Sequence, residues 1–566
     1  MILRRLYLYI VAAASLAVLA AGLVLLGTTV ALFAFNDPTA QDNRSALAGY
    51  TAMVLVAAPV WAVHFWFARR YAMRDASDRA SALRRLYLYL ACLGGAVGAA
   101  IAIAITAGDV LRPLLDTCSL VGPQPPIPFK PACPTNTDWE STSQAAWIGL
   151  VLLGVWAWHF WVAGGDRKAV GEAGASSTLR RWYMYPALLI GLLMLLAGLA
   201  QTLEVGWDKI VQSGLGNYRY IGDGLGLAMG GLVLWAAHAS TIARHHLAED
   251  RHSTLRALQG FIALAVSIAV ALTGASSILY YALARVLGVT SPGGVNGSDI
   301  AGALAAPGSQ LVVYGIAWVL VTRRLTRDAG TQEADRQAGI RRLYTNLAAL
   351  VSLVAWSVGA GMLLGTLAQQ AEAPLIGVSA SDWKDPVSLS VTLMVVGAAV
   401  WLANWRHAPW AADRQSLSRR LYVWAALLGS VLVVLGAGVA LLAVVLTQLF
   451  SVQPKLNDQA NLGFGQAFAI LVVAAGVGLY HWRVLRADAA ARPPRVAQAA
   501  AQAVPAPTPA RPQPAASAPL DPHGRHYTLV VSDATEDDIH QALAALPPHA
   551  SYRLTPTADP AAVDGS

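Results

Sequence analysis

The stretch Arg4-Arg5-Leu6-Tyr7-Leu8-Tyr9 opens the first apolar run of the chain and then recurs along it. Clear copies begin at Arg84, Arg180, Arg341 and Arg419. An altered copy begins at Arg256, where Gln259 stands in the place of the first tyrosine. A motif that returns at a steady period indicates a chain built from repeated structural units, and it has to be recognised before any other assignment. The sequence therefore predicts six repeats.

The composition places the chain among membrane proteins. Of its 566 residues, 56% are hydrophobic and 13% are charged, whereas soluble domains carry about 25% charged residues. The net charge is +8, but the arginines flank apolar runs, so lipid headgroups and topology explain them better than nucleic acid does. A signal peptide is rejected for the N-terminus, because the same motif recurs inside the chain.

Each repeat supplies two apolar runs near the roughly 20 residues that a helix needs to cross a bilayer. The predicted spans are 6–34, 47–68, 86–107, 144–163, 183–203, 223–243, 258–284, 307–322, 343–368, 388–405, 421–448 and 464–483. The expected fold is all-α and integral to the membrane, with about twelve transmembrane helices arranged as six parallel two-helix repeats.

The repeats group in pairs, and the composition changes after them. We expect membrane domains at 1–170, 171–335 and 336–486. An Ala/Pro-rich linker follows at 487–525. Alternating apolar residues and a capped acidic stretch then predict a small cytoplasmic β-α-β segment at 526–566.

Charge predicts the orientation. Arginine and lysine gather before the first helix of each repeat and are sparse in the other loops, which is the positive-inside pattern. We expect a bacterial inner-membrane protein with both termini in the cytoplasm. The arginine pairs are interpreted as lipid and topology residues that face anionic headgroups: Arg4, Arg5, Arg84, Arg85, Arg180, Arg181, Arg341, Arg342, Arg419 and Arg420. We also expect them to pair with acids of the preceding linkers: Asp75, Asp78, Glu249, Asp250, Asp328, Glu333, Asp335 and Asp413.

The predicted outer loop between Gly108 and Gln144 holds two of the three cysteines, Cys118 and Cys133. An oxidising compartment favours a Cys118–Cys133 disulfide. The alternative is two free thiols. Cys92 falls inside a span and is expected to pack as a small hydrophobe.

The second run of a repeat tends to end in Trp-x-x-His. Histidines at one depth on neighbouring helices could ligate haem or a metal. The candidate cofactor-binding residues are His64, His159, His238 and His481. The bland interpretation is an interfacial belt of aromatic residues, and it is preferred, so no cofactor and no metal site are predicted.

Small residues predict close helix contacts at Gly222, Gly226 and Gly230. Packing within the chain is preferred to packing against a second copy. The acids Asp109, Glu204 and Asp223 lie near the outer ends of spans, where solvation is the default explanation. Charged residues are missing from the predicted midplanes, which argues against coupled ion transport. No catalytic signature is present, so the chain is not predicted to be an enzyme.

The motif at Arg4–Tyr9, the ending Trp61-Ala62-Val63-His64-Phe65-Trp66 and the return to Arg84-Arg85-Leu86-Tyr87 resemble a bacterial multipass membrane family. That family is catalogued as domain of unknown function 5671. The likeness covers roughly residues 1–485 as about three tandem copies and is poor at 256–322. The resemblance implies a fold with about four spans per copy, and it implies no activity, ligand or catalytic residue.

Three functions remain open. The first is a non-enzymatic scaffold or sensor that couples to a cytoplasmic or membrane protein partner through the C-terminal segment, with the lipid bilayer as its other partner and no nucleic acid. The second is a channel or transporter for an uncharged or amphipathic solute. The third is a haem-binding electron-transfer protein.

Overall fold

A computed structural model gives the structure of the chain, and it describes residues 2–116, 137–211, 220–251, 253–294, 300–329, 335–374, 382–405, 416–449 and 464–490. Contacts divide the chain into two units, Met1–Arg492 and Pro493–Ser566. The predicted linker, the predicted β-α-β segment and the cysteines Cys118 and Cys133 lie outside the described residues. The described part contains helices and no strand.

Among the residues that the structure describes, twelve helices of the first unit are long and apolar enough to cross a membrane. They form six successive pairs, α1 with α2, α4 with α5, α6 with α7, α9 with α11, α12 with α13 and α15 with α17. Their bounds are α1 Ile2–Ala34, α2 Arg44–Arg74, α4 Ala82–Leu115, α5 Trp139–Val170, α6 Ala175–Val211, α7 Ile221–His245, α9 Thr254–Val286, α11 Ala305–Ala329, α12 Asp335–Glu372, α13 Lys384–Trp405, α15 Leu417–Leu449 and α17 Phe464–Ala490.

The twelve predicted spans are therefore confirmed in number and order. The eighth span was placed at 307–322 and is longer than expected, because the short helix α10 (Ile300–Ala303) adds its residues and the spanning segment runs over Ile300–Leu325. Two further short helices, α3 (Ala76–Arg79) and α8 (Leu247–Asp250), follow α2 and α7. We call the end of each repeat where its first helix begins and its second helix finishes the motif end, and the opposite end the far end.

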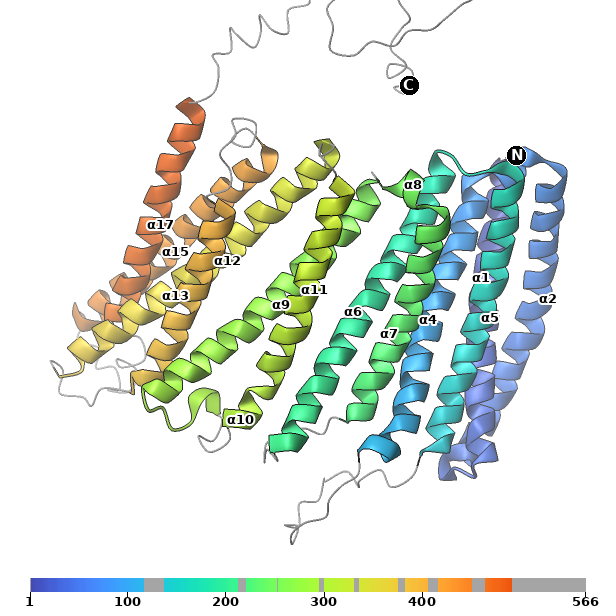
Figure 1. Ribbon diagram of the computed structural model, residues 1–566, viewed down its shortest axis with the longest axis horizontal. Coiled ribbons are helices and arrows are strands. Elements are labelled where there is room, and N and C mark those ends of the chain that lie inside the picture. Colours follow the sequence, from blue (N-terminus) through green and yellow to red (C-terminus); the bar gives the residue numbers. More distant parts are fainter. Residues whose placement is uncertain are drawn as a thin grey trace, which may run out of the picture. The chain divides into compact units, whose positions relative to one another are not determined.

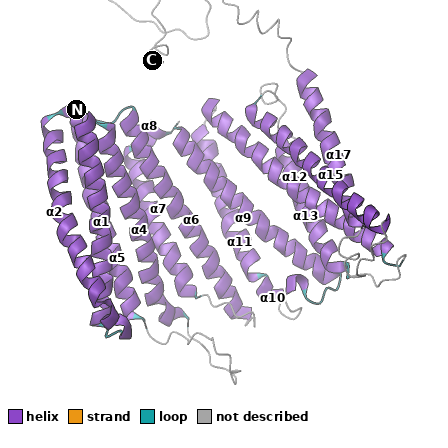
Figure 2. Cartoon of the chain, turned by 180° about the vertical axis from the view of Figure 1, so that it is seen from behind, coloured by secondary structure: helices purple, strands orange, loops and turns teal. Residues whose placement is uncertain are grey.

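Neighbouring repeats interlock through one recurring contact. The first helix of a repeat contacts its own second helix and also the second helix of the next repeat, as α4 contacts both α5 and α7. The same relation joins α1 to α5, α6 to α11, α9 to α13 and α12 to α17. Figures 1 and 2 show the pairs following one another in chain order. Each repeat thus buries its apolar faces mainly against its sequence neighbours, as in repeat proteins.

Helix α7 makes the closest of these contacts through glycine. A Cβ atom on Gly222 would lie 2.6 Å from the backbone nitrogen of Arg112 on α4, and one on Gly226 would lie 2.6 Å from that of Gly108. Gly230 faces Ala100 and Ala104, which also lie on α4. The structure thus places the predicted glycine face against α4 of the same chain, where only a missing side chain lets two backbones approach.

Candidate functional site

The polar side chains of the motif end form a repeated hydrogen-bonded triad. The indole nitrogen of Trp61, on α2, donates to the hydroxyl of Tyr87, on α4, at 3.0 Å. The same hydroxyl lies 2.9 Å from Nε2 of His159, on α5. Tyr87 is the first tyrosine of the second motif, so the tryptophan of one repeat reaches the tyrosine and histidine of the next. The motif tyrosine therefore joins two repeats.

The direction of these hydrogen bonds follows from the histidine. Nδ1 of His159 lies 2.7 Å from the carbonyl oxygen of Val155, four residues earlier on α5. A carbonyl oxygen can only accept, so Nδ1 carries the proton, and Nε2 of the neutral ring accepts from the tyrosine hydroxyl. The triad is one chain of donation from indole to phenol to imidazole to backbone, and each polar atom in it is satisfied.

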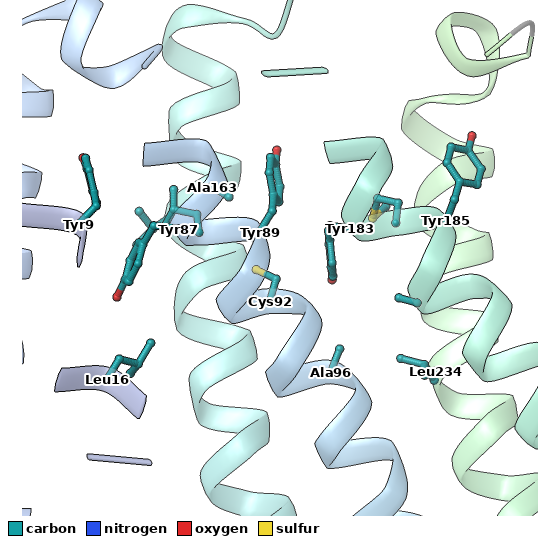
Figure 3. Close-up of a cluster of buried hydrophobic side chains, with 14 of the residues drawn as sticks. Tyr9, Leu16, Tyr87, Tyr89, Cys92, Ala96, Ala163, Tyr183, Tyr185 and Leu234 are labelled. Carbon is teal, nitrogen blue, oxygen red and sulfur yellow. The ribbon is translucent and has the colours of Figure 1, made fainter. Parts of the chain in front are cut away.

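Two further triads repeat this geometry. Trp156 donates to Tyr183 at 2.8 Å, and Tyr183 lies 2.8 Å from His238. Trp401 donates to Tyr422 at 2.9 Å, and Tyr422 lies 3.0 Å from His481. The histidines again donate through Nδ1 to the carbonyl four residues earlier. Figure 3 shows Tyr87 and Tyr183 on successive first helices, with the buried thiol of Cys92 between them.

The triad is incomplete at three places. Tyr7 lies 3.2 Å from His64, but no tryptophan among the described residues donates to it, and Tyr7 is 58% exposed. In the fourth repeat Gln259 replaces the tyrosine and Ala317 replaces the histidine. Both amide atoms of Gln259 are buried and have no hydrogen-bond partner among the described residues. In the fifth repeat Asn404 replaces the histidine and donates instead to the carbonyl of Val400 at 2.9 Å.

A second recurring contact closes the motif end of each repeat. An arginine of the motif pairs with an acid that follows the second helix of the same repeat or ends it. The pairs are Arg4 with Asp78 at 2.7 Å, Arg84 with Asp166 at 2.6 Å, Arg180 with Asp250 at 2.9 Å, Arg256 with Asp328 at 2.8 Å and Arg419 with Asp488 at 2.8 Å. Arg5 and Arg181 share the acids Asp78 and Asp250.

These pairs differ from the expectation that each arginine pairs with the linker before it. The acid instead comes about 70 to 80 residues later, because the second helix brings the chain back to where the first began. Glu172 is the exception, since it precedes Arg180 and lies 3.3 Å from its Nε. The side chain of Arg341 is outside the described part of the structure, and Arg342 and the exposed Arg420 complete the predicted set.

Burial also corrects the lipid role given to some of these arginines. Arg84, Arg85 and Arg180 are at most 1% exposed, so their guanidinium groups face carboxylates and carbonyls rather than phosphates. Arg85 donates to the carbonyl oxygens of Ala163 and Gly171, each at 3.3 Å. A buried charge is tolerated only when it is paired in this way. Arg4, with a side chain 41% exposed, remains open to solvent or headgroups.

The local sequence explains why the arginines stand at helix starts. The hydroxyl of Ser81 accepts the backbone N–H of Arg84, and Ser253 and Ser416 do the same for Arg256 and Arg419. A serine three residues before the first arginine therefore caps each of these first helices. The cap fixes the depth at which the arginine and the tyrosine enter the repeat.

The densest ionic cluster lies where the second and third repeats meet. Glu172 joins Arg85, Arg180 and the hydroxyl of Tyr89. Tyr185 donates to Asp250 at 3.1 Å, on the other side of Arg180. His246 contacts Arg180 through Nδ1. Burial, together with the positive charge of Arg180, lowers the pKa of His246 to about 4, so this ring is neutral near pH 7.

The acids of the far end are paired rather than solvated, contrary to expectation. Asp109 is buried and accepts from Arg112 at 2.8 Å and from Ser141 at 3.0 Å. Arg112 also reaches Asp223 at 2.5 Å. Asp116, which sequence analysis overlooked, accepts the backbone N–H groups of Ile221 and Gly222. These contacts tie α4 to the beginning of α7, and Glu204 is likewise buried and engaged.

The structure therefore gives the four candidate histidines a hydrogen-bonding role. Each has Nδ1 on a carbonyl and Nε2 on a tyrosine. A haem iron or metal would have to displace the tyrosine. Within the described ranges no group of three or more His, Cys, Asp or Glu side chains is placed to hold a metal. The i, i+3 spacing of Trp and His was visible in the sequence, but the tyrosine that receives them lies on other helices.

Comparison with known proteins adds the family. The model of the family described as "Domain of unknown function (DUF5671)" matches residues 5–129, 187–308 and 342–476. The second match includes much of the region where the likeness appeared poor. No curated protein and no solved structure matches the chain. Since the three matches cover well over half of the residues, the chain belongs to the DUF5671 family, as three tandem copies.

Proposed function

We propose that the protein is a non-enzymatic scaffold or sensor of the bacterial inner membrane. Its helical array would couple to a cytoplasmic partner through the C-terminal segment, with both termini on the cytoplasmic side. One observation carries this proposal: the polar side chains that looked available for chemistry bond to one another across and within repeats. Groups used in this way fix the arrangement of helices, which is what a scaffold requires.

The charge distribution supports the orientation. The arginines of the motif end are paired with carboxylates, but other arginines near it, such as Arg69 and Arg70, lie over the rings of Trp161 and Trp66 at 5.2 and 5.1 Å. Arginine with exposed tryptophan is typical of a headgroup boundary. The orientation is tested with an impermeant thiol reagent on a chain whose Cys92, Cys118 and Cys133 are replaced by serine and which carries one new cysteine at Ser77 or at Thr39. Only the far-end position, Thr39, should react in intact cells from which the outer membrane has been removed.

The scaffold proposal is tested by removing the tail. Tagged full-length protein and a chain ending at Arg492, which keeps α17 and the Arg419–Asp488 pair, are purified in a mild detergent, and co-purifying proteins are identified by mass spectrometry. A partner present at near-stoichiometric level only with the full chain is the expected result. As a control, a Gly/Ser linker of equal length in place of 493–525 should retain the partner, because it preserves reach. If the shortened chain keeps every interaction, the proposal fails.

A specific observation favours the second candidate, transport of an uncharged or amphipathic solute. Two cavities of about 340 and 460 Å³ lie between α12, α13, α15 and α17, and both are lined by Leu353, Val473 and Val477. The walls of both cavities are apolar. Both cavity volumes fall within the range of ligand pockets, about 300–1,000 Å³. Solute flux into liposomes, compared between the wild type and Val473→Trp, tests this candidate. Haem binding would appear as a Soret band in the purified protein.

A further inference from the structure

The junction between the fourth and fifth repeats contains a third cavity of about 600 Å³. It lies between α9, α12 and α13. Its walls run on α9 from Ala265 to Tyr280 and on α13 from Leu389 to Val400. Where the second and third repeats meet, glycines on α7 bring α4 and α7 into backbone contact. At this later junction the helices stay apart, and a cavity of ligand size remains.

The walls of this cavity are chemically apolar. Several hydroxyl groups line it, but they are occupied by their own helices: Ser276 donates to Leu272, Thr273 to Ala269 and Ser352 to Ala348, at 2.6, 2.9 and 2.7 Å. A hydroxyl bonded to its own backbone four residues earlier presents little polarity to a ligand. Thr392 likewise donates to Ser388 at 2.9 Å. The remaining lining is Ala, Leu, Ile and Val, apart from Gly397, Ser277 and Tyr280. The occupant must therefore be hydrocarbon along most of its length.

The cavity opens toward the lipid. Leu347 and Val351, on its α12 wall, are 57% and 63% exposed. Both belong to the apolar segment Thr345–Glu372, which is long enough to cross a membrane. The α13 wall covers about 16 Å at 1.5 Å per residue, which is about half of a hydrocarbon core near 30 Å thick. That is the depth of one leaflet, and hence the length that one acyl chain occupies.

The far-end mouth carries charges of both signs. Tyr280, on the cavity wall, donates to Asp385 at 2.5 Å. Lys384 begins α13 next to it, and its Nζ would lie 3.8 Å from a Cβ placed on Gly288, just after α9. Arg285, also at this end of α9, is exposed, and Asp382 accepts the backbone N–H of Lys384 at 3.0 Å. Two cations and two carboxylates therefore lie where α9 ends and α13 begins, beside the cavity-lining Tyr280.

We propose that this cavity binds one phospholipid with a zwitterionic headgroup, its acyl chain lying between α9 and α12/α13 and its phosphate next to Lys384. The ammonium of the headgroup faces the carboxylates of Asp382 and Asp385. The lipid fills a junction that the protein's own side chains leave open, and so joins the first four repeats to the last two. This inference is independent of the scaffold proposal, because it concerns lipid rather than the tail.

The test is photolabelling of the full-length protein in liposomes. The probe is phosphatidylethanolamine with a photoreactive group on one acyl chain, and labelled peptides are mapped by mass spectrometry. Labels should concentrate on the cavity walls of α9, α12 and α13. Ala269→Trp places an indole in the cavity and should lower this labelling about tenfold, because it displaces several methylenes from their site. Ala282→Trp, an exposed position on the same helix outside the cavity, should leave it unchanged.

Two further results decide the proposal. Lys384→Gln should reduce labelling by the phospholipid probe while leaving that by an uncharged diacylglycerol probe unchanged, since only the former carries a phosphate. Equal loss with both probes, or no loss, would overturn the headgroup assignment. Labels spread evenly over the lipid-facing helices of the wild type would overturn the whole proposal. That last measurement needs no variant, so a folding defect cannot obscure it.

Discussion

At the scale of single residues, the triad tyrosines connect neighbouring repeats. The substitution Tyr87→Phe tests how much this connection contributes to stability. The change leaves the indole N–H of Trp61 and Nε2 of His159 without partners inside the protein. Unsatisfied buried polar groups cost about 1–3 kcal/mol. We expect a lower thermal midpoint in detergent. Tyr7→Phe is the matched control, because Tyr7 is largely exposed and receives no tryptophan. Equal shifts for the two variants would contradict a structural role for the triad.

For Gln259 we expect a substitution to raise stability, the opposite of the effect of Tyr87→Phe. Both of its amide atoms are buried without partners in the described part of the chain, so the side chain is desolvated without compensation. Replacing it with leucine removes that cost. The free energy of unfolding should rise by up to about 1–3 kcal/mol, and the unfolding midpoint should rise with it. Gln369→Leu provides the control, because Gln369 donates to Gln466 at 3.2 Å and its loss should not stabilise. A lower midpoint for Gln259→Leu would show that the amide has a partner such as bound water.

His246 predicts a pH dependence. Its pKa in the folded protein is about 4, below the ordinary value near 6.5. The unfolded chain therefore binds more protons between these values, and stability falls as the pH drops from about 6.5 toward 4. Replacement of His246 by glutamine should make the unfolding midpoint depend less on pH over that window. Replacing its exposed neighbour His245 by glutamine should leave the pH dependence of the midpoint unchanged. If that control also weakens the pH dependence, the cluster around Arg180 is not its source.

At the scale of helices, contacts between α4 and α7 can be tested with one methyl group. Gly226→Ala places a Cβ against the backbone of Gly108, and such overpacking costs about 1–3 kcal/mol. The unfolding midpoint should fall. Gly94→Ala lies on α4 with nothing within 4 Å of the new Cβ, so it should be neutral or gain up to about 1 kcal/mol from helix propensity. A neutral Gly226→Ala would mean that α7 is free to move away from α4.

Helices were also the level at which sequence reasoning worked best. Spans follow from runs of apolar residues, and this local property does not depend on how helices pair. The burial of Arg84 and Arg180 could not be read in the same way. It depends on Asp166 and Asp250, which lie 82 and 70 residues further along the chain. The Trp-x-x-His spacing marked one face of α2 or α5, but only the folded arrangement brings Tyr87, on α4, to both Trp61 and His159.

At the scale of the whole membrane unit, the triads give the array a direction. Three tryptophans donate forward, from Trp61 to Tyr87, from Trp156 to Tyr183 and from Trp401 to Tyr422. Among the described residues no tryptophan donates to Tyr7, which contacts His64 instead. In the sixth repeat Gly478 stands three residues before His481, at the position that the forward tryptophan takes in the second repeat. The forward links therefore join particular neighbouring repeats rather than all six.

This series is not uniformly packed, and hydrogen exchange should reveal the difference. Glycines bring backbones together both among α4, α6 and α7 and within the later pairs, as Gly397 on α13 meets Trp356 on α12. Cavities of about 340, 460 and 600 Å³, however, lie among the helices from α9 onward. Segments with fewer buried contacts open at lower free energy. Amides in the middle of α12 and α15 should therefore exchange before those of α4 and α7 in the same detergent micelle, although all four are apolar spans.

The comparison is internal, so detergent thickness and pH act equally on both groups. Gly226→Ala should bring the exchange of α4 and α7 closer to that of α12, because it disturbs the close contact between the α4 and α7 backbones. Exchange at one common rate in the unmodified protein would mean that the twelve helices open as a single cooperative unit and that the cavities cost no local stability.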